Sequence, residues 1–279
     1  MLRNYLRIAA RVFSRNKGFT FINLLGLTLG ITSFLVILSF VYHEFSYDHF
    51  IEEKEQVYRV VQEFKNPEEG MAVAGAALAP VLAKDISAIE NYCRLHRQNS
   101  FITVHQGGTE DVYEERNLLF ADPSFFEIFD LPLLKGVKAT ALNSPGSVVL
   151  TETLARKYFG EANPLNQTIE LQGQPLQVSA VMKDLPEKTH LEIDMLVSME
   201  TFKQLNGVTG EFSSYWWPAV WTYVKLHPGA NPEAINQQLP ELIKKYRDAD
   251  MAANYIPQLR AMEDIHLYSD YYSEMKANA

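Results

Sequence analysis

The stretch FTFINLLGLTLGITSFLVILSFVY (residues 19–42) contains no charged side chain. At 1.5 Å per residue a helix of this length is about 36 Å long, which exceeds the roughly 30 Å hydrocarbon core of a bilayer. A cleaved signal peptide has an apolar stretch of about 7–15 residues that ends at a small-residue cleavage site. The present stretch is longer and runs into VYHEF (residues 41–45), which offers no such site. It therefore predicts a transmembrane helix over residues 19–43.

Charge is distributed unevenly on the two sides of this apolar stretch. Residues 1–20 contain five Lys and Arg and no acid, whereas the rest of the chain contains 20 Lys and Arg against 34 Asp and Glu. Because Lys and Arg concentrate on the cytoplasmic side of membrane helices, we expect a cytoplasmic N-terminus and residues beyond about 43 outside the cytoplasm. The acidic remainder would repel phosphate, which argues against nucleic acid as a partner.

Residues 1–18 are predicted to form a basic amphipathic helix on the cytoplasmic side. Arg3, Arg7 and Arg11 recur at four-residue spacing and therefore share one helical face, with apolar residues beside it. This pattern is typical of a helix that lies along the inner leaflet and contacts lipid headgroups. Its expected end is near residues 16–18.

Four small or polar residues of the apolar stretch fall on one side of the predicted membrane helix. Asn23, Gly26, Gly30 and Ser33 lie within about one quarter of the circumference at 100° per residue. Gly26 and Gly30 form a GxxxG spacing that lets another helix approach closely, and the Asn23 amide would then need a partner across the contact. The pattern favours a helix packed against other membrane helices, while a simple tether for an outer domain stays open.

The rest of the chain is predicted to fold as an α+β region with more than one lobe, because strands and helices alternate without a strict βαβ rhythm. Strands are expected at residues 57–64, 91–98, 101–106, 147–150, 221–229 and 258–269, and in a hairpin around Gly173, Gln174 and Pro175. Helices are expected at residues 75–90, after an Asp122 N-cap with Pro123 at the first helical position, after a Thr151 N-cap up to Gly160, and at residues 231–246 behind Asn231 and Pro232.

The sequence offers no catalytic signature. It contains no P-loop, no GxSxG and no HExxH motif, and Cys93 is its single cysteine, so neither a disulfide within the chain nor a CxxC site can form. We expect no catalytic residue, no cofactor and no metal, and the seven histidines are interpreted as single surface or core residues. The aromatic residues Tyr215, Trp216, Trp217 and Trp221 are expected to pack a strand or a lobe interface rather than a ligand site.

Five blocks of sequence carry a family resemblance. They are RNKGFTFINLLGLTLGIT (15–32), YDHF (47–50) followed by VYRV (57–60), FADPSFFEIFDLPLLKG (120–136), SVVLTETLARKYFGEANPLNQTIELQG (147–173) with VSAVMKDLP (178–186), and LRAMEDIHLYS (259–269). In this order the blocks resemble the MacB/FtsX-like permease subunits of ABC transporters, in particular their first transmembrane helix and MacB-like periplasmic core domain.

The resemblance implies a location, an architecture and a function. It places the chain in the bacterial inner membrane, with a periplasmic core domain at residues 46–279 that has one lobe from about 46–105 and 213–279 and an inserted lobe at about 106–212. A separate ABC ATPase would drive the membrane helices, and their motion would pass to the periplasmic domain for efflux or substrate extrusion. Further partners would be additional transmembrane helices, a second permease copy or homologue, membrane lipid, and a periplasmic adaptor or lipoprotein substrate.

Two other functions remain open at this point. The first is a signal-anchored binding or sensor domain that uses the membrane helix only as a tether, and the second is a membrane-anchored enzyme with a clustered polar site. The resemblance also leads us to expect that the chain is the first portion of a longer permease with further spans. No residue selects a transported substrate.

Overall fold

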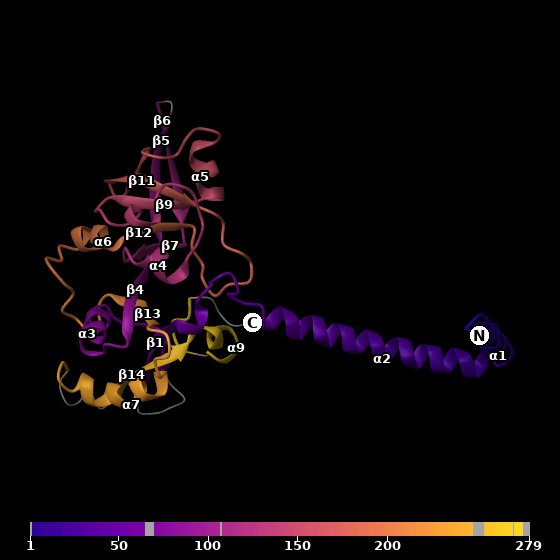
Figure 1. The fold of residues 1–279 in the computed structure, drawn as a ribbon. Coiled ribbons are helices and arrows are strands. Elements are labelled where there is room, and N and C mark those ends of the chain that lie inside the picture. The colour runs from indigo at the N-terminus through magenta and orange to yellow at the C-terminus, as the bar shows by residue number, and fades with distance from the viewer. Residues whose placement is uncertain (1, 65–69, 107, 248–253, 270, 276–279) are drawn as a thin grey trace. The chain divides into compact units, whose positions relative to one another are not determined.

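The structure is a computed structural model that describes residues 2–64, 70–106, 108–247, 254–269 and 271–275. The chain divides into two compact units, Met1–Tyr47 and Asp48–Ala279. Figure 1 shows the first as two helices and the second as a mixed α/β domain. An apolar N-terminal helix followed by an α+β domain is the fold class that the sequence predicts.

The first unit consists of α1 (Leu2–Arg15) and α2 (Lys17–Glu44), with Asn16 between them. The most apolar window of α2 has a mean hydropathy of 2.3, and among the described residues α2 is the one helix long and apolar enough to cross a membrane. None of its side chains is buried within the chain. A helix that is apolar on all sides and uncovered by its own chain needs lipid or other helices around it.

A single sheet runs through the second unit. Its strands follow the order β14 (Tyr255–Ala261), β1 (Val57–Phe64), β13 (Ala219–Leu226), β4 (Ile89–Arg97), β7 (Leu118–Ala121), β12 (Met195–Ser198), β9 (Ser147–Thr151), β11 (Gln174–Met182), β10 (Thr168–Leu171), β5 (Ser100–Gln106) and β6 (Thr109–Glu115). Short strands β2 (Gly70–Met71), β3 (Ala74–Gly75) and β8 (Leu133–Lys135) pair with β1, β13 and β11. The pairs β9–β11 and β7–β12 are parallel and the others are antiparallel.

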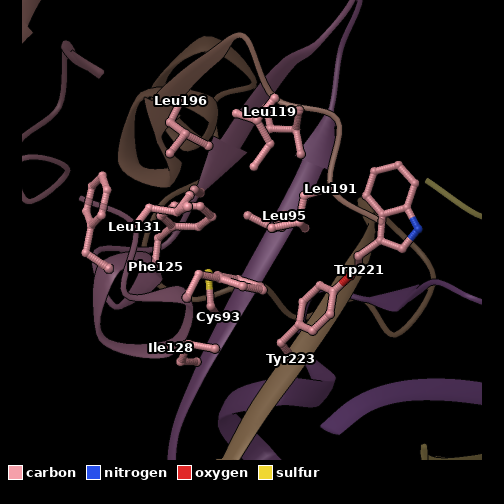
Figure 2. Packing of buried hydrophobic residues seen from close by; sticks show 14 of the residues in the cluster. Cys93, Leu95, Leu119, Phe125, Ile128, Leu131, Leu191, Leu196, Trp221 and Tyr223 are labelled. Carbon is pink, nitrogen blue, oxygen red and sulfur yellow. The ribbon is translucent and has the colours of Figure 1, made fainter. Parts of the chain in front are cut away.

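Helices cover the sheet in separate groups. They are α3 (Leu78–Asp85), α4 (Phe125–Phe129), α5 (Glu152–Phe159), α6 (Met199–Leu205), α7 (Pro232–Ile243) and α9 (Ile265–Tyr268), with 3-10 turns η1 (Lys54–Gln56), η2 (Lys138–Thr140) and η3 (Met262–Asp264). Apolar side chains of α3 and α7 share one buried cluster with β1 and β13, and those of α5 and α6 share another with β9 and β11. The phenylalanines of α4 belong to a third cluster, seen in Figure 2.

Alternation along β13 decides which side chains enter which cluster. Trp221 and Tyr223 lie in the cluster that contains α4, whereas Val224 and Leu226 lie in the one that contains α3 and α7. Successive residues of a strand point to opposite faces, so two-residue spacing produces this division. Both faces of the strand are therefore buried, and a polar residue on it must find its partner inside the protein.

Local capping signals predict two helix starts correctly. The hydroxyl of Thr151 accepts a hydrogen bond from the backbone N–H of Leu154 at 3.3 Å, which fixes the first turn of α5. Before α7, the side-chain oxygen of Asn231 accepts from the N–H of Ala234 at 3.1 Å, and Pro232 occupies the first turn. Both contacts join residues three positions apart, so neighbouring sequence suffices to find them.

The helix predicted at residues 75–90 is shorter than expected. Gly75 instead pairs with Ala219 in the sheet, the helix begins at Leu78 and ends at Asp85, and β4 starts at Ile89. A side chain at position 75 would place its Cβ 1.9 Å from the carbonyl carbon of Tyr215. Glycine is thus required there by a close backbone approach that local sequence does not reveal.

The closing strand predicted at residues 258–269 is also wrong in its second half. β14 ends at Ala261 and is followed by the helical turns η3 and α9 up to Tyr268. Met262 and Ile265 are buried in the cluster that contains α4. Their three-residue spacing fits one face of a helical turn better than one face of a strand.

The sequence predicts Asp122 as the N-cap of α4, but in the structure its side chain does not cap this helix. The helix begins after Ser124, and the Asp122 carboxylate receives bonds of 2.8 Å from Nε, Nη2 and the backbone N–H of Arg94. Burial acts to lower the pKa of Arg94, but the hydrogen bonds and charge of Asp122 outweigh it and raise that pKa. A third guanidinium nitrogen of Arg94 donates to the carbonyl of Ala76 at 2.9 Å. This buried ion pair ties β4, the end of β7 and the start of α3 together.

Substitution of Asp122 by Asn distinguishes these two roles. Asn is as good an N-cap as Asp, so a capping role predicts almost no loss of stability. Removal of one charge from a buried ion pair leaves the other uncompensated, which predicts a loss of about 3–5 kcal/mol. Denaturant unfolding of the full chain in detergent micelles measures the difference. Asp130→Asn is the matched control, since Asp130 is a half-exposed partner of Lys138, and equal small losses in both variants would contradict the ion-pair role.

Candidate functional site

The predicted packing stripe of the membrane helix lies on the surface of α2. Asn23, Gly26, Gly30 and Ser33 are all exposed. A Cβ added at Gly26 or Gly30 would meet nothing within 4 Å among the described residues. The stripe therefore has room for a second helix, and its packing role stays a prediction.

The basic face of α1 is described in part. Arg7 and Arg11 are exposed on this helix. Arg3 belongs to the same helix, but its side chain lies outside the described residues. Contact of this face with the inner leaflet likewise stays a prediction.

The second unit begins at Asp48, whose side chain is held inside the protein. Its backbone has a φ of 55°, in the left-handed region, and its side chain is 2% exposed. The carboxylate accepts hydrogen bonds from the Thr189 hydroxyl at 2.6 Å, from the His190 backbone N–H at 3.3 Å and from His190 Nδ1 at 2.8 Å. Three donors from the loop between β11 and β12 thus clamp the first residue of the domain.

His190 carries this connection into the sheet. Its Nε2 lies 2.8 Å from the hydroxyl oxygen of Tyr223, which stands on β13 and is fully buried. In Figure 2 the Tyr223 ring packs among apolar side chains such as Cys93 and Leu95, with its hydroxyl directed toward the side where Leu191 and Trp221 lie. Because the ring is enclosed, the hydroxyl depends on protein groups for its hydrogen bonds.

Arg59 on β1 continues the connection to the C-terminal part of the domain. It stands directly opposite Tyr223 in the antiparallel pair β1–β13, where side chains are close neighbours. Its two terminal nitrogens donate to the Glu274 carboxylate at 2.6 and 2.7 Å and to the Ser269 hydroxyl at 2.6 Å. A bidentate contact with a carboxylate is the strongest hydrogen-bond geometry that a guanidinium offers.

We call Asp48, His190, Tyr223, Arg59 and Glu274 the relay. Its members come from five separate parts of the chain, and they join the first residue of the domain to the C-terminal part of its described region. No motif in the sequence predicts this arrangement. Asp48 and Arg59 occur in the quoted blocks YDHF and VYRV, but no spacing rule pairs them with His190 or Glu274.

Burial and charge fix the protonation of the relay. Burial raises the pKa of Asp48, but the His190 ring and the hydrogen bonds from His190 and Thr189 more than offset this, so the pKa is lowered overall. Burial is also the main cause that raises the pKa of Tyr223. At neutral pH the relay therefore holds an ionised carboxylate at Asp48 and a protonated hydroxyl at Tyr223.

The relay is not arranged for catalysis on a substrate. Asp48, His190 and Tyr223 are 2%, 5% and 0% exposed, so a substrate cannot reach their polar atoms. Among the described residues, no group of three or more His, Cys, Asp and Glu is placed to hold a metal ion. What the relay can do is hold distant segments together.

The predicted aromatic group divides in the structure. Trp221 is buried on β13, and its Nε1 donates to the carbonyl of Ser273 at 2.9 Å. Trp216 and Trp217 are 38% and 50% exposed, and their rings contact Tyr255 and Phe202 with centroid distances of 4.3 and 5.7 Å. The packing role expected of the group holds for Trp221, which adds a further contact to the C-terminal segment.

A family model of the MacB-like periplasmic core domain matches residues 20–242, which is most of the chain and includes nearly all of α2. The chain belongs to this family. The match confirms the resemblance read from the sequence blocks. A comparison with curated proteins gives no match.

Three solved structures share the fold of this MacB-like domain. A domain of a putative permease from Porphyromonas gingivalis is 22% identical, with a TM-score of 0.61 over 76% of this chain and 92% of that one. The periplasmic region of MacB from Actinobacillus actinomycetemcomitans is 18% identical, with a TM-score of 0.53 over 75% and 90%. The extracellular domain of the ABC-type transporter YknZ from Gram-positive bacteria is 15% identical, with a TM-score of 0.50 over 73% and 99%.

The lowered pKa of Asp48 makes its contribution to stability depend on pH. A carboxyl group with a depressed pKa in the folded state stabilises the fold above its unfolded pKa, near 3.8, and the contribution is lost as pH falls. We expect Asp48→Asn to lower the free energy of unfolding by about 1–3 kcal/mol at pH 7. The gap to the wild type should shrink between pH 4 and pH 3.

Denaturant unfolding of the full chain at pH 7, 5, 4 and 3 checks this prediction. Glu241→Gln is the control, because the Glu241 side chain is 78% exposed on α7 and forms a surface ion pair with Lys244. It should change stability by less than about 0.5 kcal/mol. A gap for Asp48→Asn that is constant over this pH range would contradict the role of its ionised carboxylate.

Proposed function

We propose that the chain is the N-terminal portion of a permease subunit of a MacB/FtsX-type ABC transporter. In this function it couples ATP hydrolysis by a partner ATPase to movements of the extracytoplasmic domain, for efflux or substrate extrusion. The observation that carries the proposal is the family match over residues 20–242, which includes most of α2 as well as most of the domain.

The chain would act as a transmitter and not as a catalyst. Its sequence lacks a P-loop, so the nucleotide would bind to a separate ABC ATPase. The exposed arginines of α1 would lie at the inner leaflet close to that ATPase, and α2 would carry its motion across the membrane. The relay supports such a role because it joins the first residue after the membrane unit to the body of the domain.

We also propose a location and a set of partners for the chain. The location is the bacterial inner membrane with the N-terminus in the cytoplasm, and the membrane partners are further transmembrane helices and a second permease copy or homologue. Lipid would contact α1 and α2, and a periplasmic adaptor or lipoprotein substrate would meet the domain. The charge difference between residues 1–20 and the rest of the chain supports this orientation.

We also propose that the domain works as two lobes, about 46–105 with 213–279 and about 106–212. The sheet passes from one to the other where β4 pairs with β7. β5 lies at the end of the first range but pairs with β6 and β10 of the inserted lobe, which favours a boundary a few residues earlier, between β4 and β5. The Arg94–Asp122 ion pair crosses the same junction.

Orientation can be tested with single cysteines. Cys93 is fully buried, so its substitution by Ala gives a background for cysteines at the exposed positions Ser14 and Glu52. In intact inner-membrane vesicles of defined sidedness, a maleimide that cannot cross membranes should label only Glu52→Cys from the periplasmic side and only Ser14→Cys from the cytoplasmic side. Labelling with the opposite sidedness would overturn the proposed orientation.

Substitution of Gly26 and Gly30 in α2 by Leu separates a packed helix from a tether. Leu at Gly26 and Gly30 would block close helix approach, so recovery of the chain with its membrane partners and ATPase should fall about fivefold or more. ATP hydrolysis by the assembled transporter should fall with it. Thr32→Leu is the control, since Thr32 lies about 180° around the helix from Asn23. Full recovery of the double variant would favour the tethered binding or sensor domain.

A further inference from the structure

We propose that the relay is a latch that couples two segments at the ends of the MacB-like domain. The leading segment is residues 48–51, and the trailing segment is residue 269 with residues 271–275. The latch makes them one cooperative unit, so that release of either segment loosens the other. Its use in transmitting membrane motion rests on the proposed function, whereas the coupling itself is a property of this chain.

The leading segment depends on the Asp48 end of the relay. Besides the three bonds to its carboxylate, the Asp48 backbone N–H donates to the carbonyl of Lys188 at 3.1 Å, and Ile51 N–H donates to the Asp48 carbonyl at 3.2 Å. Ile51 is 2% exposed and packs in the cluster that contains α4. Displacement of this segment would break the bonds to the loop that carries Thr189 and His190.

The trailing segment depends on the Glu274 end. Glu274 and Ser269 bond to Arg59, the carbonyl of Ser273 accepts from Trp221, and Tyr272 pairs with the backbone near Gly70. Met275 is 3% exposed and belongs to the same apolar cluster as Ile51. The two segments thus share a core, and the backbone N–H of Glu192 donates to Met275 Sδ at 3.4 Å. Among the described residues, the charged side chains of Asp48 and Glu274 are joined through His190, Tyr223 and Arg59.

The polar groups of the relay form one connected series. A carboxylate only accepts, so His190 Nδ1 donates to Asp48, while Nε2 of the same ring shares a hydrogen bond with the Tyr223 hydroxyl. Arg59, the cross-strand neighbour of Tyr223, donates to Glu274. Loss of the Asp48 or the Glu274 carboxylate removes a hydrogen-bond partner from the next buried group of the relay. The free-energy cost of that loss then extends to the other members of the relay.

The polar nature of this link favours a latch over permanent packing. Buried charged groups contribute less to stability than apolar side chains of the same volume, because both charges must be desolvated. Their directed hydrogen bonds are made or broken as units, which gives two discrete arrangements instead of a gradual deformation. Asp48 also has a left-handed backbone that the clamp must hold in place.

Asp48 and Glu274 offer a direct test because they touch different residues. Asp48 contacts Thr189 and His190, whereas Glu274 contacts Arg59 and Ser269. Independent sites with no shared partner give additive effects on stability. For a latch, the unfolding equilibrium constant of Asp48→Asn with Glu274→Gln should differ by about threefold or more from the product of the single effects.

The same pair of substitutions is then measured in a protein that also carries Tyr223→Phe. It removes only the hydroxyl that joins the two halves and keeps the ring in its apolar site, so the domain should remain folded. In this background the non-additivity between Asp48→Asn and Glu274→Gln should disappear. Additive effects already in the wild-type background, or equal non-additivity with Phe at 223, would overturn the latch.

Hydrogen–deuterium exchange of the full chain in detergent micelles adds a local readout. Asp48→Asn should raise the exchange rate of residues 271–275 about fivefold or more, and Glu274→Gln should do the same for residues 48–51. Glu115→Gln is the matched control, because Glu115 is a buried carboxylate bonded to Lys157 and Tyr158 outside the relay. It should leave both segments unchanged.

The outcomes separate the latch from the proposed function. Unchanged exchange at the far segment, or an equal increase in Glu115→Gln, would overturn the latch and leave the permease assignment in place. Failure of the orientation and helix-packing tests would overturn the permease assignment and leave the coupling in place. Neither exchange nor unfolding requires the ATPase or a substrate.

Discussion

Burial of the Asp48 carboxylate is the constraint on which the packing of the loop between β11 and β12 against β13 depends. A charge at 2% exposure has lost its water and must be satisfied by protein donors. Thr189 and His190 supply them, and His190 in turn requires Tyr223. The position of one side chain at the start of the domain therefore fixes a loop between β11 and β12 and a hydroxyl on β13, the third strand from one edge of the sheet.

The sheet extends this constraint through the domain. Tyr223 and Arg59 are direct cross-strand neighbours, and β13 is paired on its other side with β4, which carries Arg94. Arg94 and Asp122 then hold the junction where β4 meets β7. Two buried polar clusters thus sit on strands of one continuous sheet, one where β4 meets β7 and one where β1 meets β13.

Contacts between residues a few positions apart can be predicted from the sequence, whereas contacts between distant residues cannot. The Thr151 and Asn231 caps were predicted because each bonds to a residue three positions ahead. Asp122 looked like a cap by the same rule, but its carboxylate bonds to Arg94, 28 positions earlier. The closing strand was predicted too long because burial of Met262 and Ile265 in a helical turn depends on a core assembled from distant segments.

The sequence by itself determined the membrane helix, the charge difference between its two sides, the α+β class and the family. These follow from hydropathy, charge and short motifs, which act over one turn or one strand. Only the tertiary structure decided the relay, because its contacts join residues 142, 33 and 215 positions apart. No periodicity encodes such distances. They arise when antiparallel pairing brings β1 beside β13 and the side chains of His190 and Glu274 reach that pair.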